Sequence, residues 1–216
     1  IKCGKKAMLL SLINNIGLTL LKGYVGFVGG SKALIADATH SFADIICALF
    51  GSVGIRLSNK PEDKDHPYGH GKIEFMVSVF VGAVLLFVSI GIISSAARVL
   101  FSNRSIKPPS PLTILVAAVS IYANFVVSHV TLCAAKKLNS PALKAISTDN
   151  KSDAYSSIPV LVALIGSQFG FAFLDPLGGI FVGIVVAWMG SKLIIEGYKG
   201  LMDTSVDSEI IKKIKM

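Results

Sequence analysis

The sequence predicts an all-α polytopic membrane protein with six transmembrane helices and both termini in the cytoplasm. The 216 residues are 52% hydrophobic and only 16% charged, whereas soluble domains carry roughly 25% charged residues. Six apolar runs approach or exceed the roughly 20 residues that a helix needs to cross a bilayer core. This composition excludes a soluble enzyme. It also argues against a nucleic-acid partner despite the net charge of +8, because membrane topology itself requires basic loops.

The six runs follow one another with short polar segments between them. The second and fifth are the least apolar, because they hold most of the ionisable side chains that fall inside a run. The linker between the fifth and sixth runs is short and uncharged, so these two should form a tight helical hairpin. The predicted spans are residues 7–29, 33–57, 73–100, 111–133, 142–169 and 174–195.

Basic residues are unevenly divided between the two sides of this topology. Sixteen of the 21 Lys and Arg residues fall on the side of the two termini, four fall on the other side, and Lys22 lies within the first span. Positively charged loops remain in the cytoplasm during insertion. The asymmetry therefore predicts cytoplasmic termini.

Two of the predicted spans carry ionisable side chains at helical spacing. His40 and Asp44 are four residues apart in the second span, so they share one helix face. Asp37 precedes His40 by three residues and lies on the same stripe. Asp149 and Asp153 repeat the four-residue spacing in the fifth span. Each of these spans therefore presents a polar face inside the membrane.

Such groups need compensation in lipid. A carboxylate at the bilayer centre costs about 2.5–3.5 kcal/mol on insertion scales, so four Asp and one His would together cost on the order of 10 kcal/mol. The available basic partners are Lys22 in the first span and Lys151 in the fifth, and Lys151 points away from the acidic face by helical spacing. We therefore expect metal ions or protons to neutralise the carboxylates, in preference to a role in helix packing alone.

We predict that the second and fifth helices are neighbours and that their polar faces form one transport site. The predicted metal ligands are His40, Asp44, Asp149 and Asp153. One imidazole and three carboxylates suit Zn²⁺, Mn²⁺, Fe²⁺ or Co²⁺. This face carries no thiolate, which argues against a Cu⁺ carrier. Because the ligands bind metal only when deprotonated, metal and protons compete for them. Imidazole has an ordinary pKa of about 6.5, so His40 is the expected proton carrier, with Asp37 as a relay.

The loop after the second span contains a second candidate site. Asp63, His66 and His70 have the spacing of metal ligands, and two imidazoles with one carboxylate fit zinc with a fourth position left open. The alternative is a solvated charged loop in which Pro67 and Gly69 only set a turn.

These features together resemble the cation diffusion facilitator family. The resemblance rests on six spans, on His40-x-x-x-Asp44 and Asp149-x-x-x-Asp153, and on the string from His66 to Lys72 that reads HPYGHGK. It covers essentially the whole chain. It implies homodimeric antiporters that export divalent metals in exchange for protons by alternating access. The transport ligands of the family match the four residues named above, and a secondary site matches the loop residues.

The resemblance also implies a domain organisation. Residues 1–202 are expected to form the transport domain, and residues 203–216 the start of a linker to a cytoplasmic C-terminal domain that the chain does not contain. Lys72 and Asp203 match a charge interlock of the family dimer. The chain begins at Ile1 and ends at Met216 within a charged segment, so we expect both ends to continue.

A subgroup is indicated by the fifth span. Zinc carriers of the family often have His where this chain has Asp149, and a carboxylate there leans toward manganese or iron. The string DNKSDA from Asp149 and the string MDTSVD from Met202 resemble iron-handling magnetosome members. The expected location is a bacterial inner membrane, with a magnetosome or other intracellular membrane as the alternative. The alternative functions are a scaffold or metal-sensing protein with little transport, and an uncoupled metal channel. No organic cofactor is expected.

Overall fold

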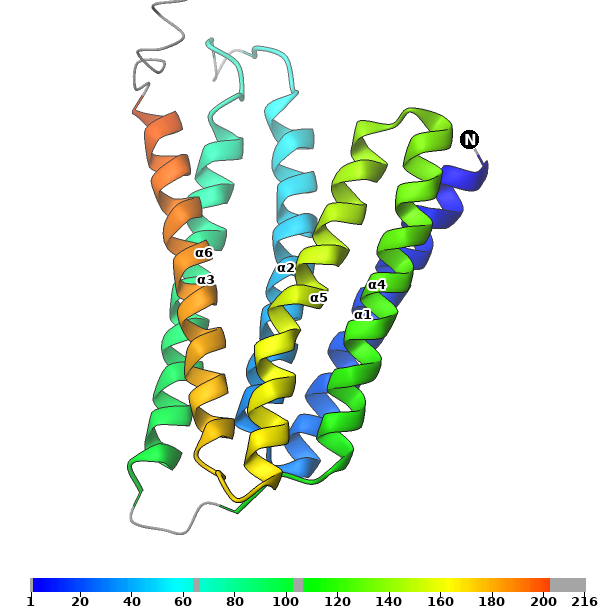
Figure 1. Ribbon diagram of the computed structural model, residues 1–216. Helices are drawn as coiled ribbons and strands as arrows, with labels where there is room; N and C mark the ends of the chain where they lie inside the picture. The colour runs from blue at the N-terminus through cyan, green and yellow to red at the C-terminus, as the bar shows by residue number, and fades with distance from the viewer. Residues whose placement is uncertain (1, 64–66, 103–106, 203–216) are drawn as a thin grey trace, which may run out of the picture. The chain divides into compact units, whose positions relative to one another are not determined.

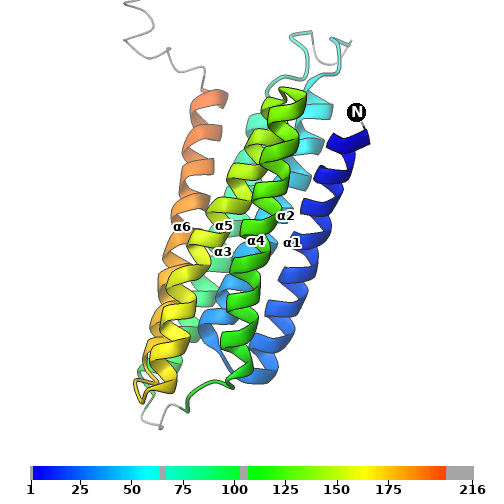
Figure 2. The same ribbon diagram turned by 45° about the vertical axis from the view of Figure 1, so that its right-hand side comes forward.

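The structure is a computed structural model that describes residues 2–63, 67–102 and 107–202, and each helix can be followed in two views (Figures 1 and 2). The described residues form helices joined by turns and loops, without a strand. The helices are α1 (Lys2–Gly29), α2 (Lys32–Ser58), α3 (Ile73–Leu100), α4 (Leu112–Leu138), α5 (Pro141–Gln168) and α6 (Leu174–Leu201). The prediction of an all-α chain with six helices is therefore confirmed, with most helix ends within a few residues of the expected ones.

Five of the helices, all except α5, are long and apolar enough to cross a membrane. α5 is equally long at 28 residues but is less apolar, because it carries the polar series from Asp149 to Asp153. Large apolar side chains such as Phe27 and Phe87, each 80% exposed, point outward from the described part of the protein. A surface of this kind suits contact with lipid, because lipid tails are as apolar as these side chains.

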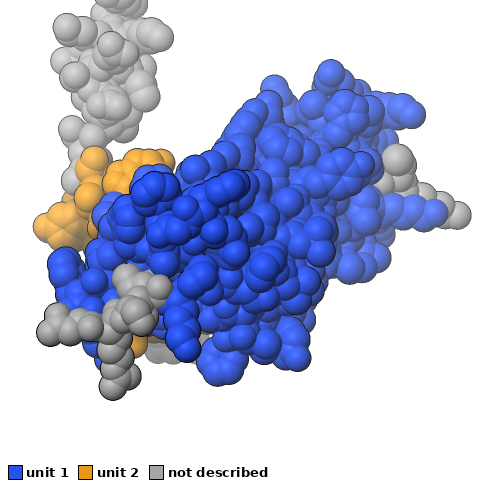
Figure 3. All heavy atoms as spheres, turned by 60° about the horizontal axis from the view of Figure 1, so that its bottom comes forward, with its two compact units in different colours: residues 1–45, 88–187 blue, residues 46–87, 188–216 orange. Residues whose placement is uncertain are grey.

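The chain divides into two compact units, which are coloured separately in Figure 3. The first comprises residues 1–45 and 88–187, and the second comprises residues 46–87 and 188–216 as far as they are described. α1, α4 and α5 belong entirely to the first unit, whereas α2, α3 and α6 each contribute to both. His40, Asp44, Asp149 and Asp153 all fall in the first unit.

In the first unit, α4 packs against both α5 and α1. Small and apolar side chains near one end of these helices form a buried cluster of Ala7, Ala134, Ala135 and Leu143. A polar contact joins α1 to α4, where Asn14 Nδ2 donates a hydrogen bond of 2.8 Å to Asn124 Oδ1. Interhelical hydrogen bonds between amide side chains of this kind stabilise membrane helix pairs.

The turn between α4 and α5 follows from its local sequence. Asn139 ends α4 in the left-handed region at φ 45°, a conformation that Asn tolerates better than most residues. Ser140 then caps α5 by accepting a hydrogen bond from the amide of Leu143, and Pro141 occupies the first turn, where its missing amide hydrogen is not needed. These three residues set the start of the helix that carries Asp149 and Asp153.

The turn between α1 and α2 brings those two helices into close contact. Gly30 adopts φ 72°, which glycine reaches without the penalty that a side chain brings. A Cβ on Gly26 would lie 3.0 Å from the amide nitrogen of Ile35, so glycine is needed for this approach. Gly26 therefore serves the packing of α1 against α2, and Gly30 serves the turn between them.

The first turn of α6 supplies the cap for α2. Asp175 is buried and accepts hydrogen bonds from the Ser31 hydroxyl at 2.6 Å and from the backbone amides of Lys32 at 2.7 Å and Ala33 at 3.2 Å. The first amides of a helix lack partners within it, and a carboxylate also interacts favourably with the helix dipole there. Asp175 therefore fixes the start of α2 within the first unit.

In the second unit, glycines allow α3 and α6 to approach closely. A Cβ on Gly82 would lie 2.6 Å from the carbonyl oxygen of Gly190, and a Cβ on Gly190 would lie 2.8 Å from that of Gly82. Small residues at facing positions are typical of membrane helix packing. The ring of Phe50 on α2 lies 5.9 Å from that of Phe80 on α3, which continues the apolar packing of this unit.

Candidate functional site

The polar face of α2 holds two of the predicted ligands close together. His40 Nδ1 lies 3.8 Å from Asp44 Oδ2, and the two side chains are 9% and 28% exposed. Both atoms are buried and have no hydrogen-bond partner. Buried polar atoms in proteins are almost always hydrogen-bonded, so each exception needs an explanation. A ligand that both atoms would coordinate is one such explanation.

The other two predicted ligands lie on α5. Asp153 is half-buried and Asp149 is exposed. Lys151 is exposed on another face of this helix, and its ammonium lies 5.8 Å from the centre of the Tyr155 ring. This contact with Tyr155 agrees with the expectation from helical spacing that Lys151 points away from the acidic face.

The register between α2 and α5 comes from one contact. Ser157 on α5 donates to the carboxylate of Asp37 on α2, at 3.0 Å from Oδ1 and 3.1 Å from Oδ2. The two helices run in opposite directions (Figure 1) and rise equally per residue. Stepping along both from this contact places Asp153 opposite about residue 41, and Asp149 opposite about residue 45. The acidic face of α5 thus lies at the level of His40 and Asp44.

The electrostatic interactions between these side chains agree with this register. Asp153 interacts with Asp44, His40 and Asp149, and Asp44 interacts with Asp149. We call His40, Asp44, Asp149 and Asp153 the four-residue site. In the described ranges, however, no three His, Cys, Asp or Glu side chains are gathered closely enough to hold a metal ion. The structure brings the four residues into one charged neighbourhood without arranging them at coordination distances.

Asp37 has a partner that spacing in the sequence did not reveal. Lys22 Nζ on α1 lies 2.8 Å from Asp37 Oδ2, and both side chains are 1% exposed. Lys22 also donates to Ser157 Oγ at 3.2 Å and to Ser41 Oγ at 3.5 Å. We call Lys22, Asp37, Ser41 and Ser157 the lysine network. The pair could have been predicted from one general rule, that ionisable residues in membrane helices tend to pair with one another.

In the loop after α2, the structure brings together two of the three predicted secondary ligands. His70 Nε2 lies 3.5 Å from Asp63 Oδ2, with His70 10% and Asp63 51% exposed. His66, the third predicted ligand, lies outside the described residues. The secondary site therefore stays a prediction.

Of the two residues of the predicted dimer interlock, the structure describes Lys72. Lys72 Nζ donates to the backbone carbonyl of Leu201 at 3.4 Å, at the last turn of α6. Cations interact favourably with the carbonyl end of a helix. Asp203 lies outside the described residues, so its pairing with Lys72 stays a prediction.

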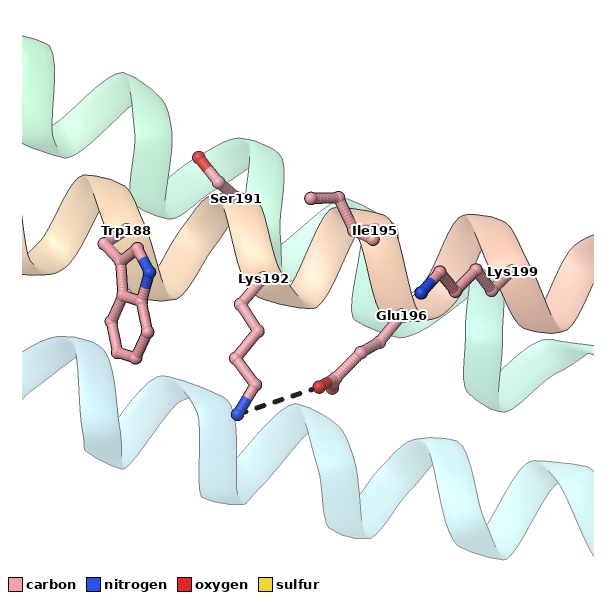
Figure 4. A pocket seen from close by; sticks show the side chains of 6 residues that line it. All are labelled: Trp188, Ser191, Lys192, Ile195, Glu196 and Lys199. Carbon is pink, nitrogen blue, oxygen red and sulfur yellow. Dashed lines mark ion pairs between the residues drawn. The ribbon is translucent and has the colours of Figure 1, made fainter. Parts of the chain in front are cut away.

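A shallow hollow lies on the surface of α6 in the second unit (Figure 4). Lys192 Nζ lies 3.8 Å from Glu196 Oε1, with both side chains about 60% exposed, and 6.0 Å from the centre of the Trp188 ring. Trp and Lys are common where a helix meets the membrane–water interface. None of the predicted metal ligands lines this hollow.

Comparison with known proteins identifies the family. The sequence profile described as the cation efflux transmembrane domain matches residues 8–202. The chain belongs to the cation efflux family. This confirms the resemblance to cation diffusion facilitators, including their magnetosome members. The family is one of membrane transporters for metal cations, which agrees with the apolar helices and does not suggest an enzyme.

Several named proteins are similar over nearly the whole chain. Magnetosome protein MamB of Magnetospira sp. (strain QH-2) is 38% identical over 97% of this chain and 71% of its own length. Manganese efflux system protein MneP of Bacillus subtilis is 35% identical over 98% of this chain and 73% of its own length. Magnetosome protein MamM of Paramagnetospirillum magneticum is 30% identical over 98% of this chain and 67% of its own length. The relatives are thus longer than this chain.

Proposed function

We propose that this chain exports divalent transition-metal ions from the cytoplasm in exchange for protons, by alternating access to the four-residue site. The observation that carries this proposal is the pair of buried atoms His40 Nδ1 and Asp44 Oδ2. They lie 3.8 Å apart without hydrogen-bond partners, at the level of two carboxylates on α5. Membership of the cation efflux family supports the direction of transport.

The ligand chemistry favours borderline and hard divalent ions. Three carboxylates and one imidazole suit Mn²⁺, Fe²⁺ and Zn²⁺, and a carboxylate at Asp149 makes the site harder than an imidazole would. Two relatives carry names that refer to manganese efflux and to magnetosomes. We therefore infer that Mn²⁺ or Fe²⁺ is the preferred substrate, with Zn²⁺ as a weaker one.

Exchange follows from competition between metal and protons. In the inward-facing state, deprotonated Asp44, Asp149 and Asp153 with neutral His40 take up the metal ion. The helices then move so that the site faces the other side, where protons occupy the ligands and the metal leaves. His40 carries a proton back because imidazole titrates near neutral pH. Rearrangement between states would bring the four side chains from their present spacing to coordination distance.

The transporter is further proposed to be a homodimer in a bacterial inner membrane or an intracellular membrane derived from it. Lys72, which precedes α3 and donates to Leu201 at the end of α6, would then interlock with Asp203. Asp63, His66 and His70 would collect metal at the entrance.

The test is metal-driven proton flux in proteoliposomes, measured with an internal pH dye while Mn²⁺ is added outside. The Asp153→Ala variant should lose this flux, because one of the three carboxylates is missing. Lys151→Ala, which lies on the same helix but on another face, is the matched control and should retain it. Equal flux in Asp153→Ala and in the wild type would remove the site assignment.

Two further measurements separate the alternatives. Mn²⁺ uptake should fall when the pH gradient is collapsed and should reverse with it, whereas an uncoupled channel would conduct regardless. A scaffold would show no binding of Mn²⁺ by calorimetry. The Asp149→His variant should shift preference from Mn²⁺ toward Zn²⁺, because an imidazole replaces a hard ligand.

A further inference from the structure

The lysine network places a fixed positive charge beside a fixed negative one inside the first unit. Lys22 and Asp37 are among the most deeply buried side chains of the described residues, at 1% exposure each. Their charged atoms lie 2.8 Å apart. A buried ion pair gives little net stability compared with apolar side chains of the same volume. Its presence therefore suggests a role other than stability.

The contacts of Lys22 join three helices. The ammonium has three hydrogens, and three oxygens lie around it: the carboxylate of Asp37, Ser157 Oγ at 3.2 Å and Ser41 Oγ at 3.5 Å. α1 supplies the cation, α2 supplies the anion and α5 supplies the bridging hydroxyl. The charge is thus held in place from three directions and is not a mobile side chain at the surface.

Both charges lie beside the four-residue site. Lys22 Nζ lies 3.5 Å from Oγ of Ser41, the residue that follows His40. Asp37 precedes His40 by three residues, so the two lie on the same face of α2. A cation at this position repels an incoming metal ion, and an anion attracts it. In a low-dielectric interior these effects extend over several ångströms.

We propose that Lys22 and Asp37 are positioning residues that set the metal affinity of the four-residue site by opposing fixed charges. The idea rests on the proposed function, because it concerns how tightly that site holds its substrate. A transport site must bind its ion firmly enough to capture it and loosely enough to release it. Lys22 weakens the hold on the metal and so permits release, while Asp37 keeps the ammonium in place and prevents it from occupying the carboxylates of the site.

The experiment compares four proteins in proteoliposomes: wild type, Lys22→Met, Asp37→Asn and the double variant. The KM and maximal rate of Mn²⁺ transport are measured for each, together with Mn²⁺ binding in detergent by calorimetry. Lys22→Met should lower KM at least about fivefold and also lower the maximal rate, because release slows. Asp37→Asn should raise KM by a similar factor. The double variant should lie within about twofold of wild type, because the two opposing charges are removed together.

The opposite signs and their cancellation distinguish this role from a structural one. If both single variants raise KM, or if the double variant is no closer to wild type than they are, the proposal is overturned. If Lys22→Met does not fold, Asp37→Asn and the double variant still decide, since a KM that rises and then returns supports the proposal. A wild-type protein that neither binds nor transports Mn²⁺ would instead overturn the proposed function, and this inference with it.

Discussion

Two polar clusters lie within two turns of each other on α2, and they differ in how completely their atoms are paired. In the lysine network, Asp37 Oδ2 lies 2.8 Å from Lys22 Nζ. The same carboxylate accepts hydrogen bonds from Ser157 Oγ, at 3.0 Å to Oδ1 and 3.1 Å to Oδ2. In the four-residue site, His40 Nδ1 and Asp44 Oδ2 are buried without a hydrogen bond. Both clusters sit in the same unit and share α2 and α5, and the lysine network also includes Lys22 on α1.

The difference separates groups whose charges are held in place by partners on neighbouring helices from groups that are kept ready for a substrate. Removing any member of a fully paired network lowers the free energy of unfolding, because the other members are left buried without partners. A set whose buried atoms lack hydrogen bonds has less stability to lose, and its value lies in what it binds. Four substitutions test this contrast, from the largest expected effect to the smallest.

Lys22→Met should lower the free energy of unfolding by about 3–5 kcal/mol, because it leaves the Asp37 carboxylate buried and unpaired. Thermal or denaturant unfolding in detergent measures this change. The double variant with Asp37→Asn should recover most of the loss. A double variant as unstable as Lys22→Met would mean that packing of the lysine stem, and not the charge, stabilises the three helices.

Asp44→Asn should show the reverse pattern. Mn²⁺ transport should fall at least about 100-fold, as expected for loss of a ligand when even indirect partners of a ligand matter 10–100-fold. The free energy of unfolding should change by less than about 1 kcal/mol, because Asp44 Oδ2 has no hydrogen bond to lose. Ser52→Ala, at an exposed position of the same helix, should alter neither quantity. A large loss of stability in Asp44→Asn would contradict the proposed difference between the lysine network and the four-residue site.

Ser157→Ala should lower the free energy of unfolding by about 1.5–3 kcal/mol, the usual contribution of a hydrogen bond to a charged group. The hydroxyl bridges Asp37 and Lys22, so both charges lose a contact. Ser152→Ala, on the exposed side of α5, is the matched control and should be within about 0.5 kcal/mol of wild type. Equal stabilities of the two variants would count against the bridge.

Asp63→Ala should have the smallest effect on stability, below about 1 kcal/mol, because its pairing with His70 is solvent-exposed on the Asp63 side. If the loop collects metal, the variant should raise the KM for Mn²⁺ while leaving the maximal rate unchanged. A lowered maximal rate with an unchanged KM would place Asp63 in the transport step instead.

The contrast also shows which features can be predicted from the sequence. The six helices follow from run length and composition, and the faces of His40 with Asp44 and of Asp149 with Asp153 follow from the four-residue spacing within one helix. Partners on different helices depend on rotation and register, which spacing along the chain does not encode. For that reason the sequence identifies Lys22 and Asp37 as charges within the spans but does not pair them, and it does not predict the register set by Ser157.

The cap that Asp175 provides for α2 has a mechanical consequence. Three hydrogen bonds run from the start of α2 to one carboxylate on α6. Separating the two helices at that end would leave the amides of Lys32 and Ala33 and the carboxylate of Asp175 without their partners. A tilt of α2 that kept these bonds would displace Asp44 further than Asp37, because Asp44 lies seven residues farther along the helix from the joint.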